Sequence, residues 1–296
     1  MSSWDETIDE VNFDPGGLDE VRRRKVRELA QKTGRNVICY YSGWLQRQDP
    51  SKAYLVQITD DDKHGFMTVL HGMDASKGLD LILHCPGGDL AATESLIHYL
   101  RSKFGADIRC IVPQISMSGG TLMAFCGKEI VMARHSNLGP IDPQLGDMSV
   151  VDILADWDAA KTEIVANPAA AGLWNPIIQK YPLGFINHVE AINQWGKDIG
   201  TSALIAGMLA GATGAPAIAA RIVDVFSSKQ THHSHARHLH REECESTGLI
   251  IKHLEDDQAL QDLVLSIHHA YIVTLASVAV GKIVENDSGK GKITFL

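Results

Sequence analysis

The sequence lacks the features that mark a secreted protein. Its 296 residues include five cysteines, an odd number with no Cys-x-x-Cys pair, which is neither a disulfide framework nor a zinc-binding pattern. The first 21 residues carry acidic side chains but no lysine or arginine, so we expect no secretory leader there. The cysteines are therefore predicted to be buried thiols, and the protein to be cytoplasmic.

An excess of basic charge is also missing. The formal net charge is −9, which argues against a nucleic-acid partner. The stretch from Ile199 to Ala220 carries no charge and is long enough to cross a membrane. It consists mostly of Ala, Gly, Ser and Thr and contains Pro216, so it would insert poorly. We expect no stable membrane span, but two close-packed buried helices broken near Gly211–Gly214.

Hydrophobic residues make up 45% of the chain, enough for a full core. Strand-like runs at 36–41, 79–84, 109–113 and 129–132 alternate with helical patterns at 62–73, after 89 and from about 118. This alternation predicts an α/β fold with a parallel sheet and right-handed crossovers. From about residue 149 the chain is predicted to be mostly helical, with helices at 152–165, 174–181, 185–228 and 257–281 and a short strand at 248–251.

Residues 1–30 are predicted to form an acidic N-terminal arm and a first helix, and within them a basic run follows directly after the acidic residues 1–21. The run holds Arg22, Arg23, Arg24, Lys25 and Arg27. We interpret these charges as a solvated helix face rather than a phosphate-binding patch. No internal repeat or low-complexity linker interrupts the rest, so residues 31–296 are predicted to form a single domain.

Two of the expected strands end in glycine pairs immediately before a helix. The first reads Cys85-Pro86-Gly87-Gly88-Asp89 and the second Ser116-Met117-Ser118-Gly119-Gly120. Glycine lets backbone N–H groups point into open space, and a serine nucleophile needs such donors to hold an oxyanion. We therefore predict Ser118 as a nucleophile, with Gly119 and either Gly87 or Gly88 as oxyanion donors.

Other interpretations of these turns remain open. A helix cap or packing turn would have the same residues, and Ser116 has the same chemistry but would face the opposite side of an extended segment. The α/β-hydrolase elbow fits badly, because it requires glycine where this chain has Ser116.

The chain resembles the serine dehydrogenase proteinase family, among the Clp-type and signal-peptide-peptidase-A-type serine proteases of the ClpP/crotonase superfamily. The residues that carry the resemblance are 79–89, 111–122, the Gly-Pro-Ile-Asp-Pro-Gln string at 139–144, 241–243, 248–249 and the helix after 257. It implies a ClpP/crotonase-like ββα spiral core with a helical C-terminal half. It also implies ATP-independent hydrolysis of peptide or protein substrates without a cofactor, and self-assembly into a homo-oligomer. By position, Ser118 matches the nucleophile, and Gly87 and Gly119 match the oxyanion donors.

The resemblance leaves the catalytic base open. Clp-type subunits place a histidine where this chain has Asp142, and the signal-peptide-peptidase branch uses a lysine that matches Lys161, giving a Ser–Lys dyad. A lysine base needs its pKa lowered from about 10.4, which burial achieves and nearby acids such as Asp158 oppose. His135, paired with Asp142, is the alternative base.

The segment from Thr231 to His240 is rich in histidine, which binds metals in some proteins. We favour a polar lid or subunit rim and predict no metal. Two further functions stay open. One is a catalytically silent ClpP-like scaffold, and the other is a crotonase-like acyl-CoA enzyme, which would use the paired glycines with an acid in place of the serine.

Overall fold

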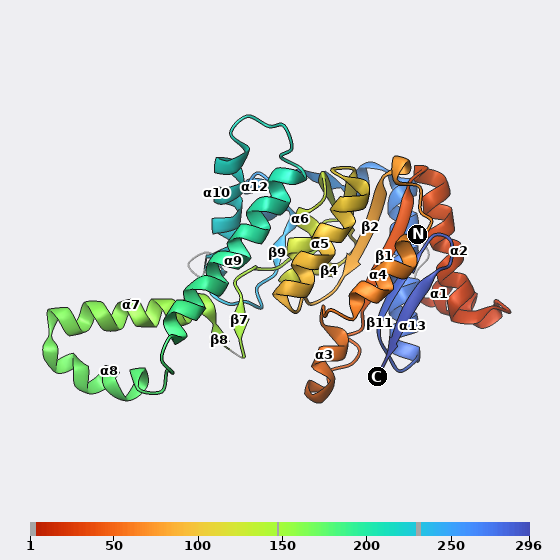
Figure 1. Ribbon diagram of the computed structural model, residues 1–296. Helices are drawn as coiled ribbons and strands as arrows, with labels where there is room; N and C mark the ends of the chain where they lie inside the picture. The colour runs from red at the N-terminus through yellow and green to blue at the C-terminus, as the bar shows by residue number, and fades with distance from the viewer. Residues whose placement is uncertain (1–3, 147, 229–231) are drawn as a thin grey trace.

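The computed structural model describes residues 4–146, 148–228 and 232–296, built around a seven-stranded sheet (Figure 1). Its strand order is β10-β5-β3-β2-β1-β11-β12. The strands are β1 (Asn36–Ser42), β2 (Leu79–His84), β3 (Ile108–Val112), β5 (Glu129–Met132), β10 (Ile251–His253), β11 (Val280–Asn286) and β12 (Gly291–Phe295). The five strands from β10 to β1 run parallel, and β11 and β12 add an antiparallel hairpin beside β1. The mostly parallel α/β sheet predicted from the sequence is confirmed.

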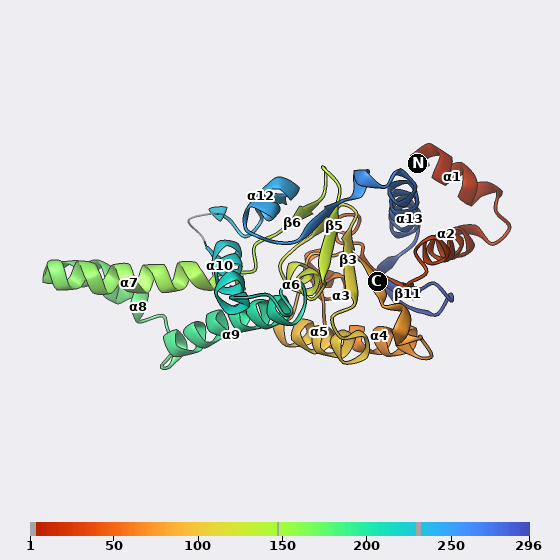
Figure 2. The same cartoon turned by 90° about the horizontal axis from the view of Figure 1, so that it is seen from above.

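Helices cover both faces of the sheet (Figure 2). On one face lie α2 (Gly17–Thr33) and α13 (Gln258–Ser277), with α1 (Trp4–Phe13) outside them. On the other face lie α4 (Asp62–Leu70), α5 (Leu90–Phe104), α6 (Gly119–Phe125), α9 (Phe185–Ala206) and α10 (Ala215–Ser227). The parallel strands are thus buried on both sides, which explains why they are apolar without alternation.

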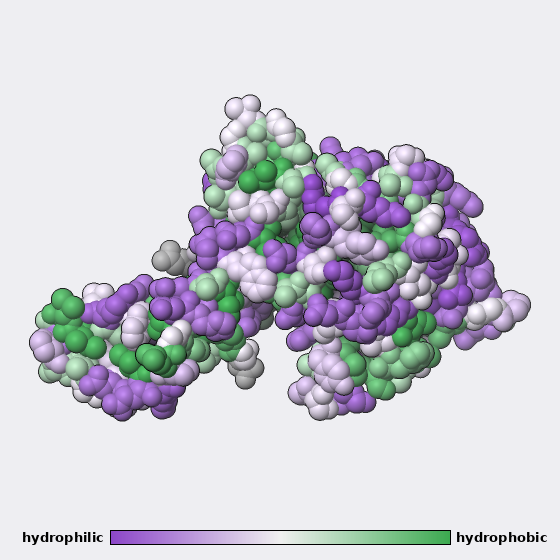
Figure 3. Space-filling model, in the orientation of Figure 1, coloured by the Kyte–Doolittle hydropathy of each residue, from purple (hydrophilic) through white to green (hydrophobic). Residues whose placement is uncertain are grey.

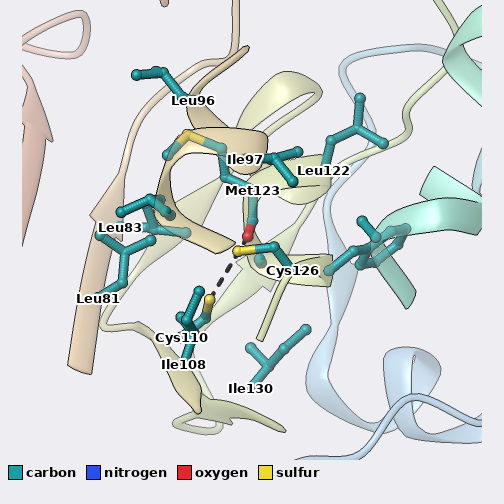
Figure 4. Close-up of a cluster of buried hydrophobic side chains, with 14 of the residues drawn as sticks. Leu81, Leu83, Leu96, Ile97, Ile108, Cys110, Leu122, Met123, Cys126 and Ile130 are labelled. Carbon is teal, nitrogen blue, oxygen red and sulfur yellow. Dashed lines mark hydrogen bonds between the residues drawn. The ribbon is translucent and has the colours of Figure 1, made fainter. Parts of the chain in front are cut away.

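Strand β2 illustrates this packing. Leu81 and Leu83 point into the core beneath α5 and α6 and belong to the same cluster as Leu122 and Met123 (Figure 4), while Ile82 joins the core beneath α2 and α13. The cysteines are all buried and free, as predicted.

The predicted elements occur in order, with shifts at their ends. Helix α4 ends at Leu70, and the short strand expected at 248–251 is β10 at Ile251–His253. The long helical stretch at 185–228 is two packed helices, α9 and α10, which break around Gly211–Gly214 as predicted. The smaller elements are η1 (Pro50–Lys52), α3 (Ala53–Val56), η2 (Ala75–Lys77), β4 (Ile115–Ser116), β6 (Asn137–Leu138), β7 (Gln144–Leu145), β8 (Met148–Ser149), α7 (Val150–Ala166), η3 (Pro168–Ala170), α8 (Ala171–Ile178), β9 (Leu239–His240), α12 (Arg241–Ser246) and η4 (Leu254–Asp256).

Two of the five basic residues of α2 are buried, so the run is only in part the solvated helix face that the sequence indicates. The Arg22 side chain is fully buried, with its Nε 3.2 Å from Glu285 Oε2 on β11 and its guanidinium carbon 5.4 Å from the ring centre of Tyr271. Lys25 is also buried, and its Nζ lies 2.6 Å from Glu10 Oε2. Because these partners come from α1, α13 and the C-terminal hairpin, the helix buries charge that pairs across the fold.

Helices α7 and α8 form an arm that projects away from the sheet (Figures 1 and 2). Apolar side chains gather on this arm (Figure 3). Val165, Leu173, Ile177 and the following Leu183 are all exposed. Exposed apolar clusters of this kind are typical of surfaces that another protein covers.

Helix α13 is, among the described residues, the one helix long and apolar enough to cross a membrane. Its apolar window is 61% buried inside the fold, against α2 and the sheet. A core helix of a folded domain has the same length and composition, so this helix is weak support for a membrane span.

Two histidines lie in an aromatic cluster on the α13 face of the sheet. His84 is fully buried, with its ring centre 4.5 Å from that of Trp44 and 5.1 Å from that of His268. Neither ring nitrogen of His84 has a hydrogen-bond partner among the described residues. Burial lowers the pKa of His84 well below its ordinary value and lowers the pKa of His268 to about 3. The fold therefore opposes protonation of both rings.

Because of this cluster, we expect the free energy of unfolding to fall when the pH is lowered from 7 to 5. The unfolded chain takes up protons on these histidines below pH about 6.5, whereas the folded chain does not, so stability falls as the pH drops. His268 alone contributes about 2 kcal/mol of this loss at pH 5. Urea unfolding at the two pH values measures it. The loss should shrink in His268→Phe and persist in His71→Gln, which changes an exposed histidine; an equal loss in all three proteins would contradict the assignment.

Candidate active site

The first glycine turn connects β2 to α5. Backbone bonds fix its path: Ile58 N–H donates to Gly87 O at 2.8 Å, and Asp89 N–H donates to Ile58 O at 2.9 Å. Asp89 then caps α5, accepting from Ala92 N–H. Gly87 has φ 93°, a left-handed conformation that favours glycine.

The second turn leads from β4 into α6 and places Ser118 at the helix N-terminus. Ser118 has φ 51°, and Ser118 and His233 are the two described non-glycine residues with positive φ. Such backbone strain costs on the order of 1–3 kcal/mol and gathers at functional sites. The N–H of Gly119 opens the helix, where it has no intrahelical partner.

The two turns touch each other. A Cβ placed on Gly87 would lie 2.7 Å from Gly119 N and 2.7 Å from Ser118 Cβ, so no other residue fits. Ser116 is fully buried and lies outside the cavity lining, so of the two serines Ser118 is the one that faces open space, as the alternation predicts. Burial raises the pKa of the neighbouring Cys85 thiol to about 11, which keeps it protonated at neutral pH.

Ser118 opens into a cavity of about 540 Å³ that also contains Gly87, Gly88 and Gly119. Its walls combine polar groups, among them Gln57, Asp89, Gln144 and His235, with the apolar side chains of Leu90, Leu122, Ile141, Leu145, Ile192 and Trp195. Helix α9 supplies the last two, and the β7–β8 hairpin supplies Leu145. A pocket with apolar walls and a few polar groups is typical of a site for a small ligand or an extended peptide.

Lys161 lies on the projecting arm rather than at this cavity. Its Nζ is 2.6 Å from Asp158 Oδ1, one helical turn earlier, and its side chain is 59% exposed. The cavity lining, taken over the described residues, does not include it. Within one chain, the structure therefore does not bring the predicted Ser–Lys pair together.

The alternative pair of His135 and Asp142 is also separated. The exposed His135 donates from Nε2 to Pro113 O at 3.0 Å, so its imidazole is hydrogen-bonded to the backbone of the loop after β3. Asp142 is buried and pairs with another histidine, His235. Its Oδ1 lies 2.8 Å from His235 Nδ1. The prediction that His135 would partner Asp142 is wrong, since each already has a different partner.

His235 is the residue that the sequence reasoning missed. It belongs to the histidine-rich segment interpreted from the sequence as a polar lid or subunit rim, and it lines the cavity together with Ser118. Thr231, the first residue of that segment, lies outside the described residues. Of the described residues, no group of three or more His, Cys, Asp or Glu is arranged to hold a metal ion.

Comparison with known proteins places this geometry in context. A family model described as "ClpP-like SDH-type serine proteinase" matches residues 16–168, which include both glycine turns and end before His235. Two uncharacterized proteins of Methanocaldococcus jannaschii, MJ0137 and MJ1495, are similar in sequence. The first is 33% identical over 141 residues, covering 46% of this chain and 48% of that protein. The second is 31% identical over 137 residues, covering 45% of each. The chain thus matches about half the length of each relative.

Proposed function

Because this chain belongs to the ClpP-like SDH-type serine proteinase family, we propose that it hydrolyses peptide bonds with Ser118 as the nucleophile. The observation that carries the proposal is the strained Ser118, held against Gly87 at the floor of a cavity. The two strand–turn–helix units are those expected of a ClpP/crotonase-like ββα spiral core.

In the proposed reaction, Ser118 Oγ attacks the peptide carbonyl carbon and loses its proton to a base. The carbonyl oxygen becomes an oxyanion, which the N–H groups of Gly87 and Gly119 would stabilise together with the positive end of α6. The C–N bond then breaks, the amine leaves with the proton, and water hydrolyses the acyl-enzyme. The proposed steps need no nucleotide, and ATP independence stays an expectation from the resemblance.

Gly88 is the weaker of the two candidate donors in the first turn. It forms a bridge with Ile58, and a Cβ on Gly88 would lie 2.3 Å from Ile58 N. The bridge bonds are made by Gly87 O and Asp89 N–H, which fix the turn on both sides of Gly88, while a Cβ on Gly87 would lie 2.7 Å from Gly119 N. We therefore assign the oxyanion contact to Gly87.

The apolar part of the cavity wall indicates which substrate side chains the site would bind. Leu90, Leu122, Ile141 and Trp195 offer apolar surface beside Ser118. Burying an apolar side chain there would contribute on the order of 1.5–3 kcal/mol. We therefore expect cleavage after leucine- or phenylalanine-like residues in preference to charged ones.

Self-assembly and the Ser–Lys dyad remain predictions for this chain. The exposed apolar side chains of the arm favour contact with a second copy. Lys161 is carried on the same arm, so a role for it as base requires approach to the cavity of a neighbouring subunit and separation from Asp158.

The test is chemical labelling and turnover by the purified protein. Wild type should react with a fluorophosphonate at Ser118 and cleave fluorogenic peptides. Ser118→Ala should lose the label and lower turnover by on the order of 10⁴-fold or more. Ser116→Ala, which changes a buried serine two residues away, should keep both activities.

A folded wild-type protein that takes no label and cleaves neither casein nor peptides would overturn the proposal. That result would favour the catalytically silent scaffold. Turnover in Ser118→Ala equal to that of wild type would exclude Ser118 as the nucleophile. Saturable acyl-CoA binding would point to the crotonase-like alternative.

A further inference from the structure

We propose that His235, held by Asp142, is the general base for Ser118, in place of the lysine that the family resemblance implies. The inference rests on the proposed peptidase function. It begins from the contact between His235 Nδ1 and Asp142 Oδ1 at 2.8 Å. An ionised carboxylate only accepts, so Nδ1–H donates, and Nε2 of the neutral ring is then the proton acceptor.

Asp142 is itself fixed in position. Its Oδ2 accepts from Ser149 Oγ at 2.7 Å and from Gln144 Nε2 at 2.9 Å. The carboxylate is buried, with its side chain 11% exposed, whereas the His235 side chain is 27% exposed where it lines the cavity. A buried acceptor behind a partly exposed imidazole is the arrangement that orients a catalytic histidine.

A small three-stranded sheet brings the three residues into one region. In the order β4-β6-β9, strand β4 ends two residues before Ser118, β6 ends four residues before Asp142, and β9 begins four residues after His235. Ser116 pairs with Leu138, and Leu138 pairs with Leu239. The backbone thus joins three segments that lie far apart in the sequence, and Ser118 and His235 line the same cavity.

The proton balance needs no further reactant. Nε2 of His235 takes the proton of Ser118 Oγ as that oxygen bonds to the carbonyl carbon, and delivers it to the leaving amine as the C–N bond breaks. Nε2 then takes a proton from the attacking water and returns it to Ser118 Oγ when the ester bond breaks. Asp142 accepts the Nδ1–H bond throughout and stabilises the imidazolium.

Acidic groups and histidines surround this imidazole. The titratable groups lining the space around it are Asp142, Asp152, His232 and His233, with Asp89 across the cavity. Among these, burial lowers the pKa of His232, which keeps that neighbour neutral near pH 7. His232 is therefore not expected to contribute to the acid limb of the pH profile, and the His235 and Asp142 variants test whether that limb belongs to this pair.

The experiment compares kcat, KM and the pH profile of kcat/KM in matched variants. His235→Asn keeps an N–H for Asp142 but removes the base, so kcat should fall by about 10²–10⁴-fold with little change in KM. In His235→Asn, the fall of kcat/KM on the acidic side of the pH profile should disappear. Asp142→Asn should lower kcat and move the acid limb to lower pH, which a purely structural role would not do. His238→Gln, an exposed histidine of the same segment, should match wild type.

The outcomes separate this inference from the proposed function. If Ser118→Ala is inactive while His235→Asn keeps kcat within threefold of wild type, the peptidase stands and the His235 assignment fails. Loss of activity in Lys161→Ala but not in His235→Asn would assign the base to the lysine. If wild type itself neither labels nor cleaves, both proposals fall. Thermal unfolding of each variant checks that the fold is intact.

Discussion

Replacing Lys282 with methionine is expected to destabilise the protein by about 3–5 kcal/mol. Lys282 lies on β11 and is 2% exposed, with its Nζ 2.8 Å from the equally buried Asp62 Oδ2. Its Nζ also donates to Gln57 O at 2.7 Å. Methionine fills the same space but leaves the Asp62 carboxylate buried without its cation. Removing one partner of a buried ion pair lowers the free energy of unfolding far more than replacing both partners with uncharged residues.

The same pair anchors the segment that fixes the first glycine turn. Asp62 Oδ2 accepts from Thr59 N–H at 2.8 Å, and Lys282 binds Gln57 O. The ion pair therefore contacts the residues on both sides of Ile58, which bridges to Gly88. Lys282→Met should therefore also slow fluorophosphonate labelling. Urea unfolding measures the stability loss.

Two controls make the Lys282 prediction specific. Lys292 of β12 pairs with Asp61, directly beside Asp62, but Asp61 is 57% exposed, so Lys292→Met should cost less than about 1 kcal/mol. Adding Asp62→Asn to Lys282→Met removes the orphaned charge and should restore part of the lost stability. Equal losses in the Lys282 and Lys292 variants would show that burial of this pair does not matter.

The glycine turns and the parallel core could be predicted because their signals are local. Continuous apolar runs such as Leu79–His84 indicate strands buried on both faces, and a glycine pair before a helix indicates an N-terminal turn. These signals located Ser118, Gly87 and Gly119, which the structure places in one cavity. No knowledge of distant contacts was needed.

The partners of charged residues could not be predicted, because they depend on distant segments. Asp142 meets His235, and Arg22 meets Glu285, across separations that no periodicity encodes. The sequence does contain one signal: an aspartate stands where a Clp-type subunit has its histidine, and a histidine-rich segment follows downstream. A buried aspartate such as Asp142 needs a partner, and the histidine-rich segment is where the sequence offers one.

At Lys161 the resemblance and the local sequence pattern point in different directions. Asp158 lies three residues before it, the spacing at which helix side chains pair on one face. The observed bond of 2.6 Å follows that rule. The Lys161 side chain is therefore exposed and ion-paired on its own helix, and within one chain it lies away from the cavity.

Replacing Gly87 with alanine should nearly abolish catalysis. The added Cβ would lie 2.7 Å from Gly119 N and 2.8 Å from Met117 O, both backbone atoms that cannot rotate away. The two turns must therefore separate, which moves the N–H groups of Gly87 and Gly119 off the oxyanion position. Loss of one such donor lowers turnover by about 10²–10³-fold, and displacement of both should exceed that range.

Gly105→Ala separates this steric effect from the strain of left-handed backbone. Gly105 follows α5 with φ 57° and has nothing within 4 Å of a Cβ, so alanine there costs roughly 1–2 kcal/mol of backbone strain without a clash. Its labelling rate should equal that of wild type, whereas Gly87→Ala should label at least 10²-fold more slowly. Far-UV circular dichroism establishes that both variants fold. Rapid labelling of a folded Gly87→Ala protein would mean that the contact between the two turns does not position the oxyanion donors.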